Sequence, residues 1–242
     1  MGMPITIEII DSDAHDDDIS KIFDYFTYID KKISTYKPDS EISLINQGKI
    51  TEKDFSLEMK MVLRLSEETK KQTDGYFDIS HEGKLDPSGL VKGWAIFNAA
   101  EMLKKAGFKN YFVEAGGDVQ VSGKNQDGQP WQVGIRNPFN REEIIKVIFL
   151  NHGEGMATSG TYIRGQHIYN PKNPGQPITD IVSLTVIGPN VYEADRFATA
   201  AFAMGKAGIH FLEKLPGLEG YVVDNKGIAT MTGGWGKYTA GY

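Results

Sequence analysis

The 242-residue sequence contains no cysteine. This absence excludes disulfides, catalytic thiolates, and zinc or iron–sulfur centres held by cysteine. No apolar run approaches the ~18–20 residues of a membrane-spanning helix. The first residues, MGMPITIEII, lack the basic start and the cleavage site of a signal peptide. We therefore expect a cytoplasmic protein without membrane insertion.

Concentrated positive charge is also missing. The 26 Lys and Arg residues are outnumbered by 32 Asp and Glu residues, for a formal net charge of -6, and no basic cluster suggests nucleic acid as a partner. With 40% hydrophobic residues, the chain is long enough to bury a full core. We find no repeat and no linker, so residues 1–242 are predicted to form a single domain.

Hydrophobic periodicity predicts helices and strands in one mixed α+β fold, with amphipathic helices packed on an antiparallel sheet. The predicted helices cover residues 17–34, 56–73, 94–107 and 191–205, and residues 36–46 are predicted to be a turn with a short helical piece. The predicted strands cover residues 4–10, 110–115, 119–123 and 180–188, a short strand in 74–80, and hairpins in 130–151 and 219–232. Residues 155–177, rich in glycine and proline and with little periodic signal, are predicted to be a long loop, either functional or disordered.

The stretch LDPSGLVKGWAIFNAAEML, residues 85–103, begins with turn residues and becomes helix-forming from Trp94. Asp86, Gly89, Lys92 and Gly93 lie where the helix begins. Amide N–H groups, a helix dipole and an ammonium together can hold a phosphate. The alternative interpretation is an ordinary capped helix start.

Two further groups of residues suggest chemistry. Asp195 and Thr199 are four residues apart, so they share a helix face and offer two oxygens to a hard cation such as magnesium. Alternatively, Asp195 interacts favourably with the dipole at the start of the helix, and Thr199 makes a hydrogen bond to the backbone of its own helix. His167, among loop, strand and turn signals, is a candidate base or orienting group, or a structural histidine. Together these features indicate an enzyme acting on a phosphoanhydride.

Nine motifs, in this order, resemble the FAD:protein FMN transferase family (the ApbE family) over nearly the whole chain. They are MG…PITIEI, STYKPDSEISLIN, GYFDIS, LDPSGLVKGWA, VEAGGDVQVSG, MATSGTYIRG, HIYNP, VSLTVIGP and EADRFATAAFAMG. The resemblance implies an ApbE-like α+β fold. It also implies an enzyme that moves FMN from FAD to a threonine of a partner flavoprotein, releases AMP and requires magnesium.

The same resemblance assigns site residues motif by motif. Asp86 and Lys92 correspond to flavin-nucleotide contacts, and Lys92 would add positive charge where negative charge develops. Gly89 corresponds to a main-chain oxygen ligand of magnesium, and Asp195 and Thr199 to its side-chain ligands. The remaining assignments are three FAD contacts and a candidate base for the attacking threonine: Met1, Tyr36, Tyr169 and His167.

The chain also departs from the family pattern. Only His81–Lys84 stand where the family has a longer insert with a tryptophan-bearing motif that contacts FAD. Asn170 replaces an aspartate, Ala198 stands where some members are acidic, and MGM stands where MGT is common. The usual secretory or lipoprotein leader is not present. Two alternative functions therefore stay open: an FAD pyrophosphatase that gives FMN and AMP, and a flavin-binding protein without turnover.

Overall fold

The computed structural model describes residues 2–161 and 168–239 of the chain. Its centre is a seven-stranded antiparallel sheet with strand order β1-β4-β5-β8-β9-β10-β11. The strands are β1 (Ile5–Ile9), β4 (Tyr111–Ala115), β5 (Asp118–Ser122), β8 (Gly155–Gly160), β9 (Ile181–Gly188), β10 (Glu219–Asp224) and β11 (Ala229–Met231). The predicted class, helices packed on an antiparallel sheet, is confirmed.

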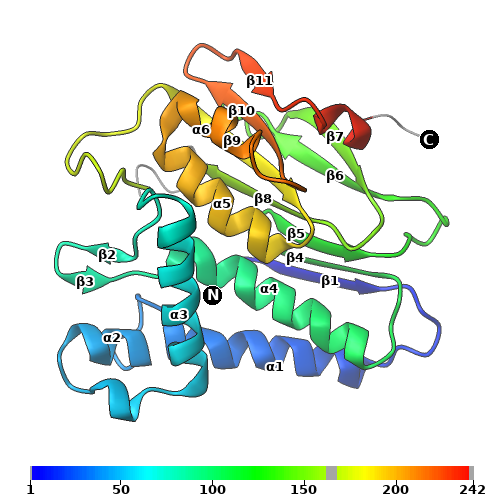
Figure 1. Cartoon of the computed structure of the whole chain (residues 1–242). Coiled ribbons are helices and arrows are strands. Elements are labelled where there is room, and N and C mark those ends of the chain that lie inside the picture. Colours follow the sequence, from blue (N-terminus) through cyan, green and yellow to red (C-terminus); the bar gives the residue numbers. More distant parts are fainter. Residues whose placement is uncertain (1, 162–167, 240–242) are drawn as a thin grey trace.

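Helices cover one face of this sheet, and a hairpin covers the other. Helices α4 and α5 lie side by side against the sheet, with α1 and α3 outside α4 (Figure 1). The helices are α1 (Asp16–Ile33), α2 (Glu41–Asn46), α3 (Leu57–Gln72), α4 (Ser88–Lys105), α5 (Val191–Ala203) and α6 (Gly208–Leu212). The hairpin of the opposite face is β6 (Trp131–Arg136) with β7 (Ile144–Leu150), and a smaller hairpin pairs β2 (Ser80–His81) with β3 (Lys84–Leu85).

The core follows from the periodicity of the elements. In α1, residues Ile22, Phe26, Ile29 and Ile33 are buried against the other helices, while the opposite side of the helix is exposed. Along a strand the side chains alternate between faces. In β10, Val222 therefore joins the cluster under α5, whereas Tyr221 and Val223 join the cluster under the β6–β7 hairpin.

Three sequence predictions about local structure were wrong. Of the short strand predicted in 74–80, only Ser80 lies in a strand, β2. Within the predicted loop 155–177, residues Gly155–Gly160 form β8, a central strand of the sheet. Strand β8 is mostly buried and, apart from Met156, made of small residues, so it lacks the alternation by which a half-exposed strand is found. Helix α4 begins at Ser88 and not at Trp94, so Gly89, Lys92 and Gly93 belong to its first turns.

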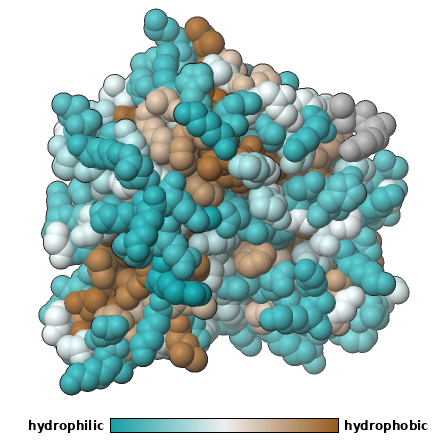
Figure 2. Space-filling model, viewed as in Figure 1, coloured by the Kyte–Doolittle hydropathy of each residue, from teal (hydrophilic) through white to brown (hydrophobic). Residues whose placement is uncertain are grey.

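Figure 2 shows the face of the molecule that Figure 1 presents. Hydrophilic residues cover most of this face. Apolar residues gather mainly at the lower left, over α2 and the neighbouring part of α3. Across residues 2–161 and 168–239, no helix combines the length and the apolar character needed to cross a membrane.

Candidate functional site

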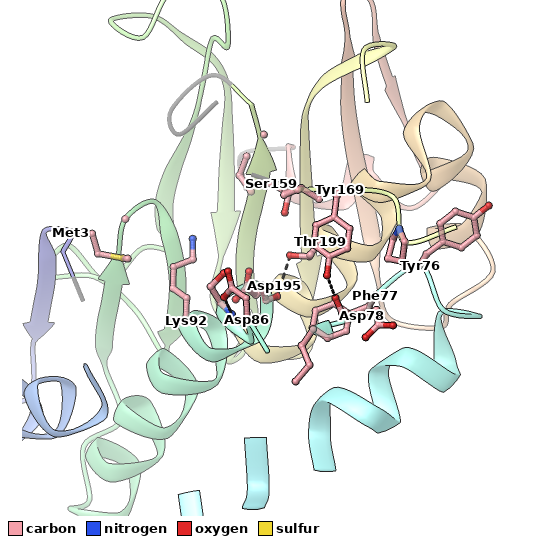
Figure 3. A pocket seen from close by; sticks show the side chains of 18 residues that line it. Met3, Tyr76, Phe77, Asp78, Asp86, Lys92, Ser159, Tyr169, Asp195 and Thr199 are labelled. Atoms are coloured by element: carbon pink, nitrogen blue, oxygen red, sulfur yellow. Dashed lines mark hydrogen bonds between the residues drawn. The ribbon is translucent and has the colours of Figure 1, made fainter. Parts of the chain in front are cut away.

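A pocket opens where the first turns of α4 meet α5, the end of β8 and two loops. Counting its open mouth and the solvent space there, it holds about 1040 Å³ not filled by protein atoms. Figure 3 shows Met3 and Lys92 on one side, Tyr76 and Tyr169 on the other, and Asp86, Asp195 and Thr199 between them. The loops contribute Tyr76–Ile79, Asp86 and Ile168–Tyr169, and the strand contributes Thr158–Gly160.

One wall of the pocket is the crossing of two helices, which we call the helix wall (Gly89, Lys92 and Gly93 of α4, Asp195 and Thr199 of α5). The glycines are four residues apart on α4 and face an aspartate and a threonine four apart on α5. A Cβ at Gly93 would lie 2.5 Å from the Asp195 Cβ, and one at Gly89 would lie 2.8 Å from the Thr199 Cγ2. Only glycine therefore permits this approach of the two helices.

Polar contacts run across the same crossing. The Gly93 N–H donates to the Asp195 Oδ2 at 2.7 Å, and the Thr199 hydroxyl donates to the Gly89 carbonyl at 3.1 Å. Asp195 lies in the second turn of α5 and is buried. The structure thus brings together Gly89, Asp195 and Thr199, which come from two helices far apart in the sequence.

These three residues offer a carbonyl, a carboxylate and a hydroxyl oxygen, the ligand types that magnesium prefers. Among residues 2–161 and 168–239, no three His, Cys, Asp or Glu side chains lie close enough together to hold a metal ion by themselves. A cation here would therefore rely on main-chain and hydroxyl oxygens besides carboxylate. The donor set fits a hard cation, and magnesium binding stays a prediction.

Lys92 is not a solitary charge in this pocket. Its Nζ lies 2.7 Å from the Oδ2 of Asp118, the first residue of β5. The Asp118 side chain is 1% exposed, and its Oδ1 accepts the Thr158 N–H at 3.1 Å. Asp118 could not be identified as a partner of Lys92 from the sequence, because a residue that follows two glycines carries no signal that its side chain reaches a helix.

Two interpretations were open for the start of α4, a phosphate site and an ordinary capped helix start, and the position of Asp86 is compatible with both. Its Oδ1 accepts the N–H of Ser88 at 3.0 Å, as a capping side chain does, and the residue also lines the pocket. The first turn of α4, including Ser88 and Gly89, faces the same pocket. The pocket therefore receives the positive end of an 18-residue helix dipole.

The opposite wall consists of two loops that bind each other, and we call it the loop wall (residues 74–81 and 168–172). The Tyr169 hydroxyl donates to the Asp78 carbonyl, and the Tyr169 ring stacks on His81 with centroids 4.0 Å apart. Lys172 pairs with Asp74 and lies over the Tyr76 ring, 4.5 Å from its centroid. Each of these contacts is made by a side chain.

The Tyr169 phenol stays protonated at ordinary pH. Burial, and then the nearby carboxylates of Asp78 and Asp86, raise the pKa of Tyr169 to about 12. A neutral phenol can donate its hydrogen bond to the Asp78 carbonyl. The Asp78 carboxylate is itself held by Lys70, whose Nζ lies 2.7 Å from the Asp78 Oδ2.

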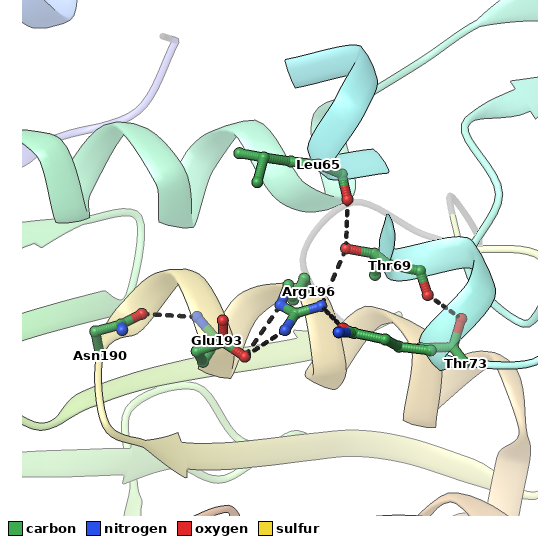
Figure 4. A network of polar contacts seen from close by, with 7 residues as sticks. Leu65, Thr69, Thr73, Asn190, Glu193 and Arg196 are labelled. Atoms are coloured by element: carbon green, nitrogen blue, oxygen red, sulfur yellow. Dashed lines mark hydrogen bonds and ion pairs between the residues drawn. The ribbon is translucent and has the colours of Figure 1, made fainter. Parts of the chain in front are cut away.

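Arg196 connects the helix wall to the loop wall through hydrogen bonds between α5 and α3. It follows Asp195 on α5, is 6% exposed, and donates to Thr69 and Gln72 near the end of α3, from which the loop wall continues (Figure 4). It also pairs with Glu193 on its own helix, which keeps the buried guanidinium neutralised. The position of α5 is thereby tied to the position of the loop that begins after α3.

Three predicted site residues, Tyr36, Met1 and His167, are not among the described residues that line the main pocket. Tyr36 is 87% exposed and lines a second hollow between the end of α1 and the start of α4. This hollow shares Met3, Ser88 and Lys92 with the pocket, so the two adjoin. Met1 and His167 lie outside the described residues, and their predicted roles stay predictions.

Comparison with known proteins assigns the chain to a family. The model of the ApbE family matches residues 1–83 and 80–222. Over 157 residues the chain is 33% identical to the FAD:protein FMN transferase of Klebsiella pneumoniae (strain 342), which covers 61% of this chain and 45% of that protein. Over 133 residues it is 37% identical to the FAD:protein FMN transferase of Haemophilus influenzae, covering 50% of this chain and 38% of that protein.

Solved structures agree on the fold. The flavin transferase ApbE from Vibrio cholerae superimposes with a TM-score of 0.85 at 23% identity, covering 98% of this chain and 96% of that one. The ApbE protein from Thermotoga maritima gives a TM-score of 0.85 at 22% identity, covering 98% and 99%. The chain spans less than half the length of the two curated relatives. Since the family model covers most of the sequence, this chain belongs to the ApbE family.

Proposed function

We propose that the chain is a magnesium-dependent FMN transferase that moves FMN from FAD to a threonine of an acceptor flavoprotein and releases AMP. The observation that supports this most is the convergence at the helix wall. The start of α4, the Lys92 ammonium and three oxygen donors of cation-binding type all face one pocket. Anions bind at helix N-termini, so the pyrophosphate of FAD suits this end of the pocket.

The proposed transfer breaks one phosphoanhydride bond and forms one phosphoester bond. The threonine oxygen attacks the phosphorus of the FMN half, and AMP leaves with the bridging oxygen. The hydroxyl proton passes to a base, for which His167 is the candidate from the family resemblance. Lys92 and the α4 amides would stabilise negative charge on the phosphate oxygens.

Gly89, Asp195 and Thr199 are the proposed magnesium ligands. Bound there, the ion would neutralise charge on the pyrophosphate. Tyr36, Tyr169, Asp86 and Met1 are the proposed contacts to the rest of FAD. The hollow beside Tyr36 and the pocket beside Tyr169 adjoin at Lys92, so a dinucleotide could occupy both with its pyrophosphate near the ammonium.

Incubation with FAD, magnesium and candidate flavoprotein domains, followed by intact-mass measurement, tests this function. A gain of one FMN unit on the acceptor, lost when the acceptor threonine is changed to valine, supports the transferase. Free FMN and AMP without a modified acceptor would indicate the pyrophosphatase instead. Bound but unchanged FAD would indicate a flavin-binding protein.

Replacement of His167 tests the proposed base. A positioned base contributes about 10²–10⁴-fold to the attack of a hydroxyl group. His167→Asn should lower FMN transfer by that order while FAD and magnesium still bind, as measured by fluorescence titration. Full transfer with intact binding would remove His167 from the reaction, and weakened FAD binding alone would make it a structural residue of its loop.

A further inference from the structure

Asp118 stands apart from the other acidic residues around the pocket, because it does not line the pocket and is almost fully buried. Its carboxylate is 1% exposed and is fixed at both oxygens, by the Thr158 N–H at 3.1 Å and by the Lys92 Nζ at 2.7 Å. Thr158 belongs to β8, which pairs with β5, so two neighbouring strands of the central sheet hold this carboxylate.

Lys92 needs such a partner. Its side chain is 13% exposed and lies on α4, where it lines both the pocket and the hollow beside Tyr36. A lysine side chain has four rotatable bonds and loses much rotamer entropy when one position is imposed. A carboxylate anchored on the sheet imposes that position before any ligand arrives, which lowers the cost of binding.

Other acids line the same two hollows as this ammonium. Asp86 and Asp195 line the pocket with Lys92, and Asp30 lines the adjoining hollow. A mobile ammonium could turn toward any of them and leave the place where an anion would sit. A carboxylate that fixes the ammonium on the sheet keeps its positive charge at the pocket.

We propose that Asp118 is a positioning residue that holds Lys92 at the junction of the two hollows, where it selects ligands that carry a phosphate. This inference rests on the proposed function, since it assumes that the pocket takes FAD. Asp118 itself does not touch the ligand. Its effect reaches the phosphate only through Lys92.

The test uses two flavins that differ by one phosphate, FMN and riboflavin, in fluorescence titrations of the whole chain, with FAD as the reference ligand. Asp118→Asn keeps the size of the side chain and an oxygen for the Thr158 N–H but removes the charge that holds Lys92. It should weaken FMN binding about tenfold, as expected for a hydrogen bond between charged groups, and riboflavin binding by less than about twofold. Because Lys92 transmits the effect, Asp118→Asn should add nothing to Lys92→Met.

Asp118→Glu is the matched variant, since it restores the charge but moves it by one methylene. We expect it to weaken FMN binding as well, because position and not charge alone is required. It also carries the test if Asp118→Asn does not fold, which a thermal melt would reveal.

Three results would overturn the proposal: equal weakening of FMN and riboflavin, additive effects of Asp118→Asn and Lys92→Met, or tighter FMN binding in the asparagine variant. The last result would mean that Asp118 merely neutralises Lys92. A parent protein that does not bind FAD would remove the proposed function together with this inference. If the parent protein binds FAD but the variants keep the parent's preference for FMN over riboflavin, the role of Asp118 is refuted and the proposed function is not.

Discussion

The two walls of the pocket are built on different principles. In the helix wall, spacing is set by backbone: glycines on α4 let α5 approach until side-chain oxygens meet main-chain groups. In the loop wall, spacing is set by side chains: a phenol on a carbonyl, a ring stack, and a lysine on an aspartate. Backbone packing in a close-packed core has little freedom, whereas such side-chain contacts exchange more readily with water.

This difference matches two different tasks, which are contact with phosphate and metal at the helix wall and contact with aromatic rings at the loop wall. Groups that must act on a phosphate need fixed positions to within fractions of an ångström. All the proposed metal ligands lie on the helix wall. Aromatic surface for a flavin or adenine ring needs less precision, and Tyr76 and Tyr169 lie on the loop wall. We therefore expect substitutions in the helix wall to lower turnover more than substitutions in the loop wall.

Between the two walls, the largest effect is expected for Asp195→Asn. Asparagine can still accept the Gly93 N–H, so the fold should persist, but the charge for a cation is lost. We expect FAD turnover to fall by at least about 100-fold, as for the loss of a charged metal ligand. Tyr169→Phe in the loop wall should cost less than about tenfold, the equivalent of one hydrogen bond.

The comparison is measured as initial rates at several magnesium concentrations, with circular dichroism as the check on folding. Saturating magnesium should not restore the Asp195→Asn variant. A normal rate in that variant would contradict the assignment of Asp195 as a ligand. A larger loss in Tyr169→Phe than in Asp195→Asn would reverse the proposed division between the walls.

A smaller effect, on stability, is expected for Gly93→Ala. The added methyl would lie 2.5 Å from the Asp195 Cβ and 2.7 Å from the Val191 carbonyl oxygen, so the helices must move apart. Overpacking costs about 1–3 kcal/mol, against at most about 1 kcal/mol gained from the helix propensity of alanine. Urea unfolding should therefore show a less stable protein.

Gly236→Ala is the matched control for this change. A Cβ at Gly236 would meet nothing within 4 Å, so the substitution should be neutral or stabilising by less than about 1 kcal/mol. Equal unfolding free energies for the two variants would show that the helix crossing adapts freely. The helix wall would then be no more rigid than the loop wall.

The sequence could predict the fold class and most elements because their patterns are local. The strongly amphipathic α1 and the β6–β7 hairpin show their periods within a few residues. The errors at β8 and at the start of α4 have a different origin. Small residues and glycines there serve contacts with α5, and a low helix propensity at Gly89 and Gly93 is outweighed by tertiary packing.

The same limit applies to the site. Asp195 and Thr199 could be paired from the sequence because two residues that are four positions apart on a helix lie on the same face. Lys92 and Asp118 could not, because their contact depends on how α4 lies across β5. The stack of His81 on Tyr169 likewise joins two loops far apart in the chain. The residue types at the helix start indicated Asp86, Gly89 and Lys92, and family resemblance added Tyr169, but neither indicated the residues that hold them.

The smallest effect concerns the response of the loop wall to alkali. The pKa of Tyr169, about 12, lies above the ordinary value of 10.0, so the folded protein holds this proton more tightly than the unfolded chain. The stabilisation linked to Tyr169 is thus complete below about pH 10 and is lost as the pH rises to about 12. Tyr169→Phe lacks both the proton and the hydrogen bond to the Asp78 carbonyl. Near pH 8 the parent should be more stable by about 0.5–1.5 kcal/mol.

That difference should shrink toward zero between about pH 10 and pH 12. Urea unfolding of both proteins across this range measures it. Burial also raises the pKa of Tyr25, Tyr192 and Tyr221, but those residues are common to both proteins and cancel in the difference. A difference that stays constant with pH would mean that the Tyr169 proton does not help to hold the two loops together. The stack on His81 and the Lys172 contacts would then have to hold the loop wall without it.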